Sequence, residues 1–436
     1  MTMEQELLAV AIMQPSSLYG HAVEVYSEFR KNPVVPADAV IRRFFLDRKY
    51  LGAKDRRFIA DTYFGTIKNW RRLEALVLDS FADCEVTADR TIAAFAIVFQ
   101  GESAGSIREA FAKFQLPTDA LARLADRDRE TARLAMLARD ERLGILHSFP
   151  TWFVTRMVEE YGSEHIEPIL RSSNGEAPTA IRANTIFTSR EELERELAEE
   201  NIETTPSKIS PDALVLAKRV NVFGLPEFQR GAFEVQDEAS QLVAPFANIR
   251  KTAIKALDAC AGAGGKTLHL SALMKNHGEI FATDADPRKL EALKQRSRRS
   301  GAQNIRIVLP DQKERMLGAD KAAWFDLVLL DAPCTGTGTI RRNPGIKWLL
   351  TEQMLAELIE KQRIILEENA HFVKPGGTLL YATCSLLKEE GEAQMEWFTR
   401  QHPEFLVEET LRTRPDLEGS DGFFAARLRK NHLSGE

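Results

Sequence analysis

The sequence predicts a doubly wound α/β domain, preceded by an all-α domain and a small α+β connector. Three observations predict this order. Helical periodicity fills residues 1–140, short strand-like pieces follow in 141–235, and apolar runs alternate with helical stretches over 236–436. At 436 residues the chain is also too long for one compact core, which agrees with two or three domains.

The segment 1–140 has apolar residues at spacings of three and four, as in "RFIADTYFGTIKNWRRLEALV", and little of the alternation typical of strands. We therefore expect an all-α domain. Within it, residues 41–72 hold ten Lys or Arg against three Asp. Such a run fits either a phosphate-binding face or a solvated helical face, and the aromatic residues between the charges fit both.

The helical pattern ends at "SFPTW", residues 148–152. The stretch 151–235 combines one helix with strand-like pieces such as "TAIRAN" and "ALVLAK", separated by Pro and Gly. Its helix at 190–203 holds seven Glu against two Arg, which is typical of a solvated helix. These features predict a small α+β connector over 141–235.

Five apolar runs with helical stretches between them follow: "AIKALDA", "GEIFATD", "NIRIVLP", "FDLVLLD" and "GGTLLYAT". Parallel strands joined by right-handed crossovers satisfy this pattern. Two last runs, "EFLVEE" and "GFFAARL", have little between them and predict a closing antiparallel hairpin. In such a sheet, ligands bind at the carboxyl ends of the strands, near the switch in strand order.

The composition is ordinary for a soluble protein, with 44% hydrophobic and 28% charged residues and a net charge of −6. No apolar run is long enough to span a bilayer, and "MTMEQELLAVAIMQ" lacks the basic start and cleavage site of a signal peptide. We expect a cytoplasmic protein without a membrane partner. Four cysteines without C-x-x-C spacing, and no clustered histidines, predict no metal site.

The turn between the first large-domain strand and its helix reads "LDACAGAGGKT", residues 257–267. A phosphate-binding P-loop needs glycine where Cys260 stands, and the dinucleotide fingerprint needs glycine where Thr267 stands. S-adenosylmethionine carries no phosphate, and Asp284 at the end of the second strand is placed to accept its ribose hydroxyls. A tight turn without a ligand is the alternative. The turn's small residues would let the backbone approach a cofactor closely; they are Ala261, Gly262, Ala263, Gly264 and Gly265.

The fourth and fifth strands end in "LLDAPCTGTG" and "LLYATCS", which place Asp331, Cys334 and Cys384 near the cofactor's reactive end. A thiolate that adds to carbon 6 of a pyrimidine makes carbon 5 nucleophilic enough to attack a methyl group, after which a base removes the carbon 5 proton. Asp331 is a candidate acid for ring nitrogen 3, although alone it also fits an ordinary strand-end carboxylate. Two structural cysteines at adjacent strand ends would be a coincidence, so covalent catalysis is favoured.

Four motifs, "CAGAGGKT", "DAPCTGTG", "RRNPGIKW" and "YATCS", resemble in order the signatures of the RNA (cytosine-5) methyltransferases of the RsmB, Nop2 and Sun family. The pieces "VQDEAS" at 235–240 and "DGFFAARL" at 421–428 match as well, and the resemblance covers 148–430. It implies a Rossmann-like, seven-stranded domain that uses S-adenosylmethionine. It also implies that Cys384 is the nucleophile and that Cys334 assists release of the methylated base.

The resemblance implies cofactor contacts at the first turn and at three further strand ends. They are Cys260, Ala261, Gly262, Ala263, Gly264, Gly265, Lys266, Asp284, Asp311 and Asp331. Lys266 is also expected near Asp331. The sequence departs from the family where Ala263 replaces a usual proline and where Gly345 replaces a usual aspartate. Neither change removes a reacting group, but the second leaves the substrate loop one carboxylate short.

"GAKDRRFIADTYFGTIKNW" resembles, more faintly, the NusB-like helical RNA-binding domain of the bacterial 16S ribosomal RNA enzyme of this family, which implies RNA contact through 41–72. We therefore expect a monomeric RNA (cytosine-5) methyltransferase that acts on small-subunit ribosomal RNA. A tRNA cytosine-5 methyltransferase with the same catalytic residues, or a non-catalytic RNA-binding protein of ribosome assembly, are the alternatives. A DNA methyltransferase is disfavoured because it would leave Cys384 without a role.

Overall fold

The computed structural model describes residues 13–432, which form two compact units. The first comprises the described residues up to Asn174 together with Arg342–Leu350. The second comprises Gly175–Arg341 and the described residues from Thr351 onward. This grouping differs from the predicted boundaries at 140 and 235, because the connector strands share a unit with the large sheet; the three-domain division stays a prediction. No helix within 13–432 is long and apolar enough to cross a membrane.

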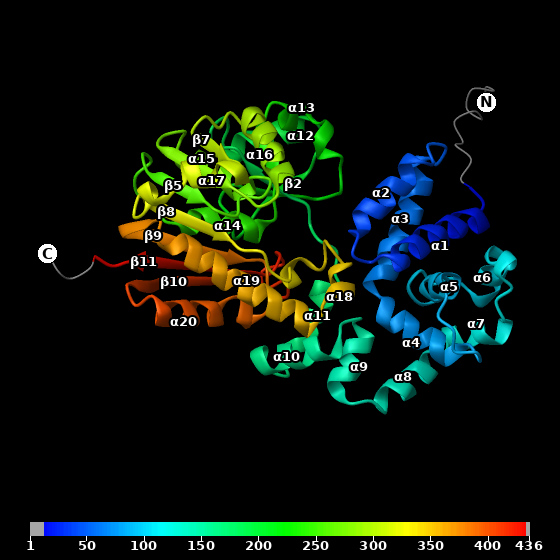
Figure 1. Cartoon of the computed structure of the whole chain (residues 1–436). Coiled ribbons are helices and arrows are strands. Elements are labelled where there is room, and N and C mark those ends of the chain that lie inside the picture. Colours follow the sequence, from blue (N-terminus) through cyan, green and yellow to red (C-terminus); the bar gives the residue numbers. More distant parts are fainter. Residues whose placement is uncertain (1–12, 433–436) are drawn as a thin grey trace, which may run out of the picture. The chain divides into compact units, whose positions relative to one another are not determined.

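The regular elements that the structure describes in the first unit are all helices (Figure 1). This confirms the all-α prediction and fits a NusB-like domain. Helix α5 is its most buried helix, with each residue from Thr91 to Val98 inside the core. Gly65 of α3 lets the Phe95 ring approach, since a Cβ there would lie 2.1 Å from a ring carbon. The α-helices are α1 (Pro15–Lys31), α2 (Ala37–Leu46), α3 (Ala53–Lys68), α4 (Trp70–Ser80), α5 (Ala88–Phe99), α6 (Ala104–Ala110), α7 (Thr118–Ala125), α8 (Arg127–Ala135), α9 (Arg139–Leu146), α10 (Thr151–Tyr161), α11 (Ile166–Ser173) and α18 (Ile346–Leu349).

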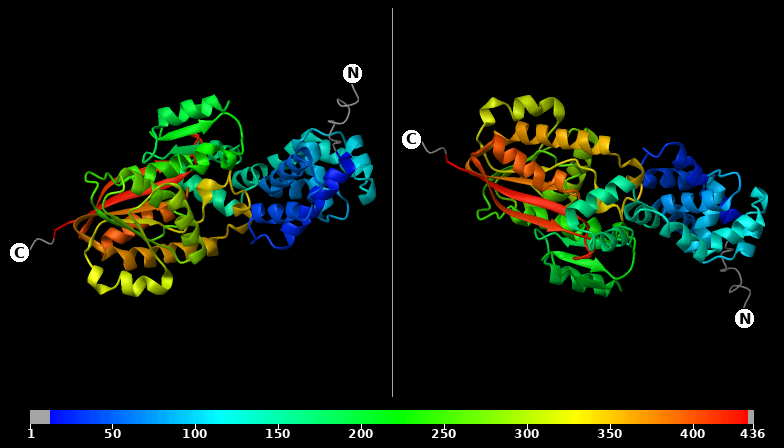
Figure 2. Two further views of the ribbon diagram at one scale, coloured as in Figure 1. Left: turned by 90° about the horizontal axis from the view of Figure 1, so that it is seen from above. Right: turned by 90° about the horizontal axis from the view of Figure 1, so that it is seen from below.

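The second unit contains a small antiparallel sheet, seen as a lobe of this unit in Figure 2. Its strands are β1 (Ala180–Ala183), β2 (Thr204–Pro206), β3 (Ala213–Leu216) and β4 (Phe233–Val235), in the order β2-β3-β1-β4. Helix α12 (Arg190–Glu199) begins with a capping box in which Ser189 and Glu192 hydrogen-bond each other's backbone N–H. The predicted α+β character of this region is confirmed.

The large sheet has seven strands in the order β10-β11-β9-β8-β5-β6-β7. They are β5 (Lys255–Asp258), β6 (Glu279–Thr283), β7 (Ile305–Val308), β8 (Phe325–Asp331), β9 (Val373–Thr383), β10 (Phe405–Thr413) and β11 (Phe423–Lys430). The first five are parallel, and β10 and β11 form the predicted antiparallel hairpin. The chain builds β5, β6 and β7 in one direction and then returns to place β8 on the other side of β5. The switch in strand order therefore lies between β5 and β8.

Helices cover both faces of this sheet, which explains why its strands are continuous apolar runs. Leu366 of α19 and Phe398 of α20 belong to the core on one face, and Val243 of α14 and Leu270 of α15 to the core on the other (Figure 1). The remaining helices of the second unit are α13 (Pro226–Gln229), α14 (Glu238–Phe246), α15 (Gly265–Leu273), α16 (Pro287–Arg299), α17 (Lys313–Met316), α19 (Glu352–Ala370) and α20 (Glu392–Gln401). Buried on both faces, the sheet offers ligands the carboxyl ends of its strands.

Candidate active site

The turn after β5 is shaped by two left-handed glycines and by Asp284. Gly262 has φ +54° and Gly264 has φ +90°, a conformation that side chains rarely adopt. A Cβ on Gly264 would also lie 2.2 Å from Leu293 Cδ1 of α16. Gly262 N–H donates to Asp284 Oδ2 at 2.9 Å, so this carboxylate connects the ends of the first two strands of the sheet.

A cavity of about 1010 Å³ opens beside this turn. Among the predicted cofactor residues, Cys260, Gly262, Asp284 and Asp331 line it. The other predicted cofactor residues do not line the cavity; they are Ala261, Ala263, Gly264, Gly265, Lys266 and Asp311. Pro310, the residue directly before Asp311, does line it.

Sequence reasoning missed the wall of the cavity that α19 supplies. Lys361, Ile365 and Glu368 line it from one face of this helix, at spacings of four and three. This spacing is the sequence signal that could have predicted the wall, but every ordinary helix face has the same spacing. The structure describes no group of His, Cys, Asp and Glu within 13–432 that could hold a metal ion.

Lys266 and Asp331 form an ion pair beside the cavity. Lys266 Nζ donates to Asp331 Oδ2 at 2.6 Å, and the lysine is almost wholly buried. Asp258, at the end of β5, is a third charged neighbour that sequence reasoning missed. Burial, with a smaller contribution from Asp331, raises the pKa of Asp258 to about 7. The strand ends therefore gather two carboxyl groups around one ammonium group.

The two thiols meet as the strand order predicts. Cys334 follows the end of β8 and Cys384 directly follows β9, and these strands are parallel neighbours. Their Sγ atoms lie 3.4 Å apart. The hydrogen bond to Cys384 and then burial raise the pKa of Cys334, so Cys334 keeps its proton. Burial likewise raises the pKa of Cys260, which lines the cavity as a neutral thiol.

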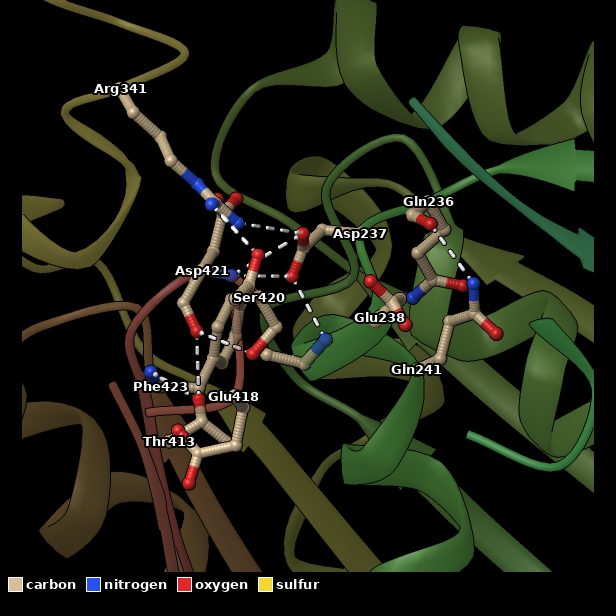
Figure 3. Close-up of polar contacts among 12 residues, drawn as sticks. Gln236, Asp237, Glu238, Gln241, Arg341, Thr413, Glu418, Ser420, Asp421 and Phe423 are labelled. Carbon is tan, nitrogen blue, oxygen red and sulfur yellow. Dashed lines mark hydrogen bonds and ion pairs between the residues drawn. The ribbon is translucent and has the colours of Figure 1, made fainter. Parts of the chain in front are cut away.

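A buried polar cluster holds the far end of the loop that carries Cys334 (Figure 3). Arg341 Nε donates to Asp421 Oδ1 at 2.7 Å, and Arg341 Nη2 lies 3.7 Å from Asp237 Oδ2. Asp421 N–H donates to Asp237 Oδ1 at 3.2 Å. The two aspartates belong to "VQDEAS" and "DGFFAARL", motifs whose role the sequence did not reveal. They tie the loop after β8 to the start of α14 and to the start of β11.

The same loop touches the hairpin through glycine backbones. Gly338 N–H donates to the carbonyl of Cys384 at 3.0 Å, and Gly422 N–H donates to the carbonyl of Gly338 at 2.9 Å. A Cβ on Gly338 would lie 1.9 Å from Gly422 O, so no larger residue fits without movement. Glycine at 338 is therefore a steric requirement of the site.

Comparison with known proteins identifies the family of the chain. A protein-family model described as 16S rRNA methyltransferase RsmB/F matches residues 248–429, and a ferredoxin-like domain of RsmF/B-like methyltransferases matches 149–223. Ribosomal RNA small subunit methyltransferase B of Sodalis glossinidius is 36% identical over 312 residues, which cover 68% of this chain and 69% of that protein. The chain belongs to the RsmB/F family of RNA methyltransferases.

Other RsmB/F relatives and one solved structure agree. The protein of the same name from Photorhabdus laumondii is 33% identical over 295 residues, covering 65% of this chain and 67% of that one. The crystal structure of PH0851 is 27% identical, with a TM-score of 0.76, and covers 96% of this chain and 99% of that one. The predicted seven-stranded methyltransferase fold is thereby confirmed.

The RsmB/F motif "RRNPGIKW" is divided between the two units. Arg341 belongs to the second, whereas Arg342–Leu350 belongs to the first. Lys347 is buried there and donates to the carbonyl of Lys68 at 2.5 Å and to Asn174 Oδ1 at 2.8 Å. Burial lowers the pKa of Lys347 well below its ordinary value. This part of the expected substrate loop is thus built into the helical unit.

The departure at Gly345 lies in the same segment. An added Cβ would stand 3.8 Å from Ala37 Cβ and from a Phe29 ring carbon, which is ordinary contact distance. The family's usual aspartate would therefore fit at its first side-chain atom, and nothing in the structure explains its replacement.

Proposed function

We propose that this RsmB/F family member methylates carbon 5 of a cytosine in small-subunit ribosomal RNA, through a covalent adduct on Cys384 and with S-adenosylmethionine as methyl donor. The observation that carries the proposal is the pair of thiols 3.4 Å apart at the ends of β8 and β9. The names of the relatives, ribosomal RNA small subunit methyltransferase B, support the class of RNA.

The residues of the large cavity fit the proposed cofactor. A Cβ on Gly262 would meet no atom within 4 Å, so the backbone there borders open space. The Asp284 carboxylate accepts two backbone N–H groups and has lone pairs left for ribose hydroxyls. Ile365 and Pro310 offer apolar surface for a base. When bound, S-adenosylmethionine supplies an electrophilic methyl group.

The chain's own residues perform the rest of the reaction. The sulfur of Cys384 bonds to carbon 6, and the carbon 5–carbon 6 double bond supplies the electron pair with which carbon 5 becomes nucleophilic. Ring nitrogen 3 gains negative charge in the adduct, and Asp331 stabilises it by donating a proton that the Lys266 ammonium, 2.6 Å away, can pass to the carboxyl group. A water molecule takes the proton of carbon 5, the double bond forms again, and the carbon–sulfur electron pair returns to Cys384 while the Cys334 S–H group donates a hydrogen bond to the departing sulfur.

The surroundings of the thiols support this division of roles. Cys334 keeps its proton because its pKa is raised, and it can donate that proton in the hydrogen bond to the sulfur of Cys384. Cys384 is accordingly the nucleophile, and Cys334 assists the elimination.

The test compares Cys334→Ala and Cys384→Ala after incubation with S-adenosylmethionine and unmodified small-subunit RNA. We expect a covalent protein–RNA band on a denaturing gel with Cys334→Ala and none with Cys384→Ala. Cys84→Ala, which removes an exposed thiol, is the matched control and should methylate normally without a band. The reverse pattern would make Cys334 the nucleophile. Methylation of transfer RNA but not of small-subunit RNA by the wild type would replace the proposed substrate.

A further inference from the structure

Glu390 is a buried carboxyl group close to both thiols that the mechanism above does not use. It lies six residues after Cys384, in the 3-10 turn Lys388–Glu390, and its side chain has no exposed surface. Glu390 Oε1 accepts the backbone N–H of Thr335 at 2.9 Å, and Glu390 Oε2 accepts the Thr335 hydroxyl at 2.5 Å. The Glu390 carboxyl group thus accepts two hydrogen bonds from Thr335.

The residues that directly follow the two cysteines meet beside this carboxyl group. Thr335 follows Cys334 and Ser385 follows Cys384. The Ser385 hydroxyl lies 3.3 Å from Thr335 Oγ1, and that oxygen itself donates to Glu390 Oε2. The backbone of Glu390 contributes as well, since its carbonyl accepts the hydroxyl of Thr383, the last residue of β9, at 3.2 Å.

Gln362 of α19 extends the network to the other side of Cys334. Its Nε2 donates to Glu390 Oε1 at 2.9 Å and to the carbonyl of Pro333 at 3.0 Å. The backbone before Cys334 and the backbone after it are therefore both held by groups that meet at Glu390. Burying a carboxyl group is costly unless its oxygens are hydrogen-bonded, and here both oxygens are.

We infer that Glu390 is a positioning residue, which sets the distance and direction between Cys334 and Cys384 by holding Thr335 directly and Ser385 through the Thr335 hydroxyl. Its catalytic consequence rests on the proposed function. If Cys334 assists release of the methylated base, an enzyme without the Glu390 network forms the adduct but releases it slowly. Glu390 does not line the cofactor cavity, so cofactor affinity does not depend on it.

The geometry is tested first, without RNA, in full-length protein carrying Cys84→Ser. Diamide oxidises two neighbouring thiols to a disulfide, while its N=N bond takes up their two hydrogens and becomes a hydrazine. We expect the Cys334–Cys384 disulfide, followed by peptide mass mapping, to form about tenfold more slowly in Glu390→Ala than in the parent. An unchanged rate would overturn the inference.

Glu390→Gln is the conservative rescue variant. Its amide oxygen can accept both N–H donors that now meet Oε1, and its amide N–H group can donate to the Thr335 hydroxyl, which can rotate to accept. We expect a disulfide rate near that of the parent. A rate as slow as that of Glu390→Ala would show that the hydrogen-bonded geometry is not what Glu390 supplies.

The catalytic consequence is measured next. We expect Glu390→Ala to accumulate the covalent RNA band seen with Cys334→Ala, to lose about 10²-fold in kcat and to keep its KM for S-adenosylmethionine. A merely structural defect would lower methylation without any band, and that result in a folded variant would overturn the inference. If Glu390→Ala does not fold, Thr335→Val removes only the hydroxyl that donates to Glu390. This variant should also form the disulfide more slowly and accumulate more covalent adduct, and no change in either measurement would overturn the inference.

The two proposals fail separately. If Cys334→Ala traps no adduct on any RNA, the proposed function fails, while the disulfide rates still decide the role of Glu390. If Cys334→Ala traps the adduct but Glu390→Ala matches the wild type in both readouts, only the positioning role fails.

Discussion

Asp258 ends β5 with its side chain inside the core, where one oxygen accepts the hydroxyl of Thr267 at 2.7 Å. Its carboxyl group has an ordinary pKa of 3.8 when solvated, and burial raises the pKa in the folded protein to about 7. The folded protein therefore binds this proton more tightly than the unfolded chain does. The stability that Asp258 contributes is complete below pH 4 and is lost as the pH rises to 7.

Asp258→Asn should remove this pH dependence. The amide has no proton to lose, and its oxygen can still accept from Thr267. We expect the free energy of unfolding of the variant, relative to the wild type, to rise between pH 5 and pH 8, because only the wild type must ionise a buried carboxyl group. Urea unfolding at the two pH values measures the difference. Parallel pH profiles for the two proteins would contradict it.

The loop between β8 and α19 illustrates what decides the site at the scale of elements. Its register on the hairpin depends on Gly338, whose carbonyl and N–H group both pair with backbone of other segments. Arg341 lies at the far end of the buried part of the loop, and its side chain donates a hydrogen bond to Asp421. Sequence motifs predicted that this loop is functional, but not that its position depends on a hairpin more than 80 residues later.

Gly338→Ala should disturb the loop without removing any reacting group. A methyl group 1.9 Å from Gly422 O forces the two backbones apart, and overpacking of this kind costs about 1–3 kcal/mol. We expect a lower melting temperature and a larger loss of methylation than of stability, because Cys334 moves with the loop. Gly105→Ala, in the exposed part of α6, is the control, because its Cβ would meet only Ser103 Oγ at an ordinary 3.7 Å, and it should lower neither. Normal methylation by Gly338→Ala would contradict the expectation.

At the scale of the whole molecule, the basic segment 41–72 divides into two kinds of cation. Arg71 and Arg72 are structural: Arg71 donates to Thr151 Oγ1 at 2.6 Å, and Arg72 forms a two-bond pair with the buried Glu130. Other cations of the segment are exposed to solvent, where RNA phosphates could reach them; they are Arg42, Arg43, Lys49, Lys54 and Arg57, of which Arg42 and Arg57 also pair with the exposed Asp38 and Asp61. A count of charges in the sequence does not distinguish the structural cations from the exposed ones.

Replacing Arg42, Arg43 and Arg57 by glutamine should weaken RNA binding and leave stability nearly unchanged. Each lost phosphate contact lowers the slope of log affinity against log salt by about 1. Filter binding of small-subunit RNA at several salt concentrations measures this slope. Arg72→Gln is the contrasting variant: it leaves the buried Glu130 with only the longer contact to Arg127 at 3.5 Å and should cost about 3 kcal/mol of stability. An unchanged salt slope in the triple variant would place RNA contact elsewhere.

Much of the fold followed from local pattern. The five parallel strands, the closing hairpin and the all-α first half were predicted because the spacing of apolar residues depends on local backbone geometry. The approach of Cys334 to Cys384 also followed, since both end neighbouring parallel strands. The cavity wall on α19 did not, because Lys361 and Ile365 belong to a helix face of ordinary appearance.

The sequence by itself determined the kinds of element and their order, and it supplied the groups that we propose to react, because helices, parallel strands and strand-end motifs are encoded within short stretches of chain. Only the tertiary structure decided which cations of 41–72 remain exposed, that Arg342–Leu350 belongs to the helical unit, and that Glu390 holds Thr335, the residue after Cys334. The physical reason is distance along the chain. Thr335 and Glu390 are 55 residues apart, and no local pattern records which distant donor a buried carboxyl group will meet.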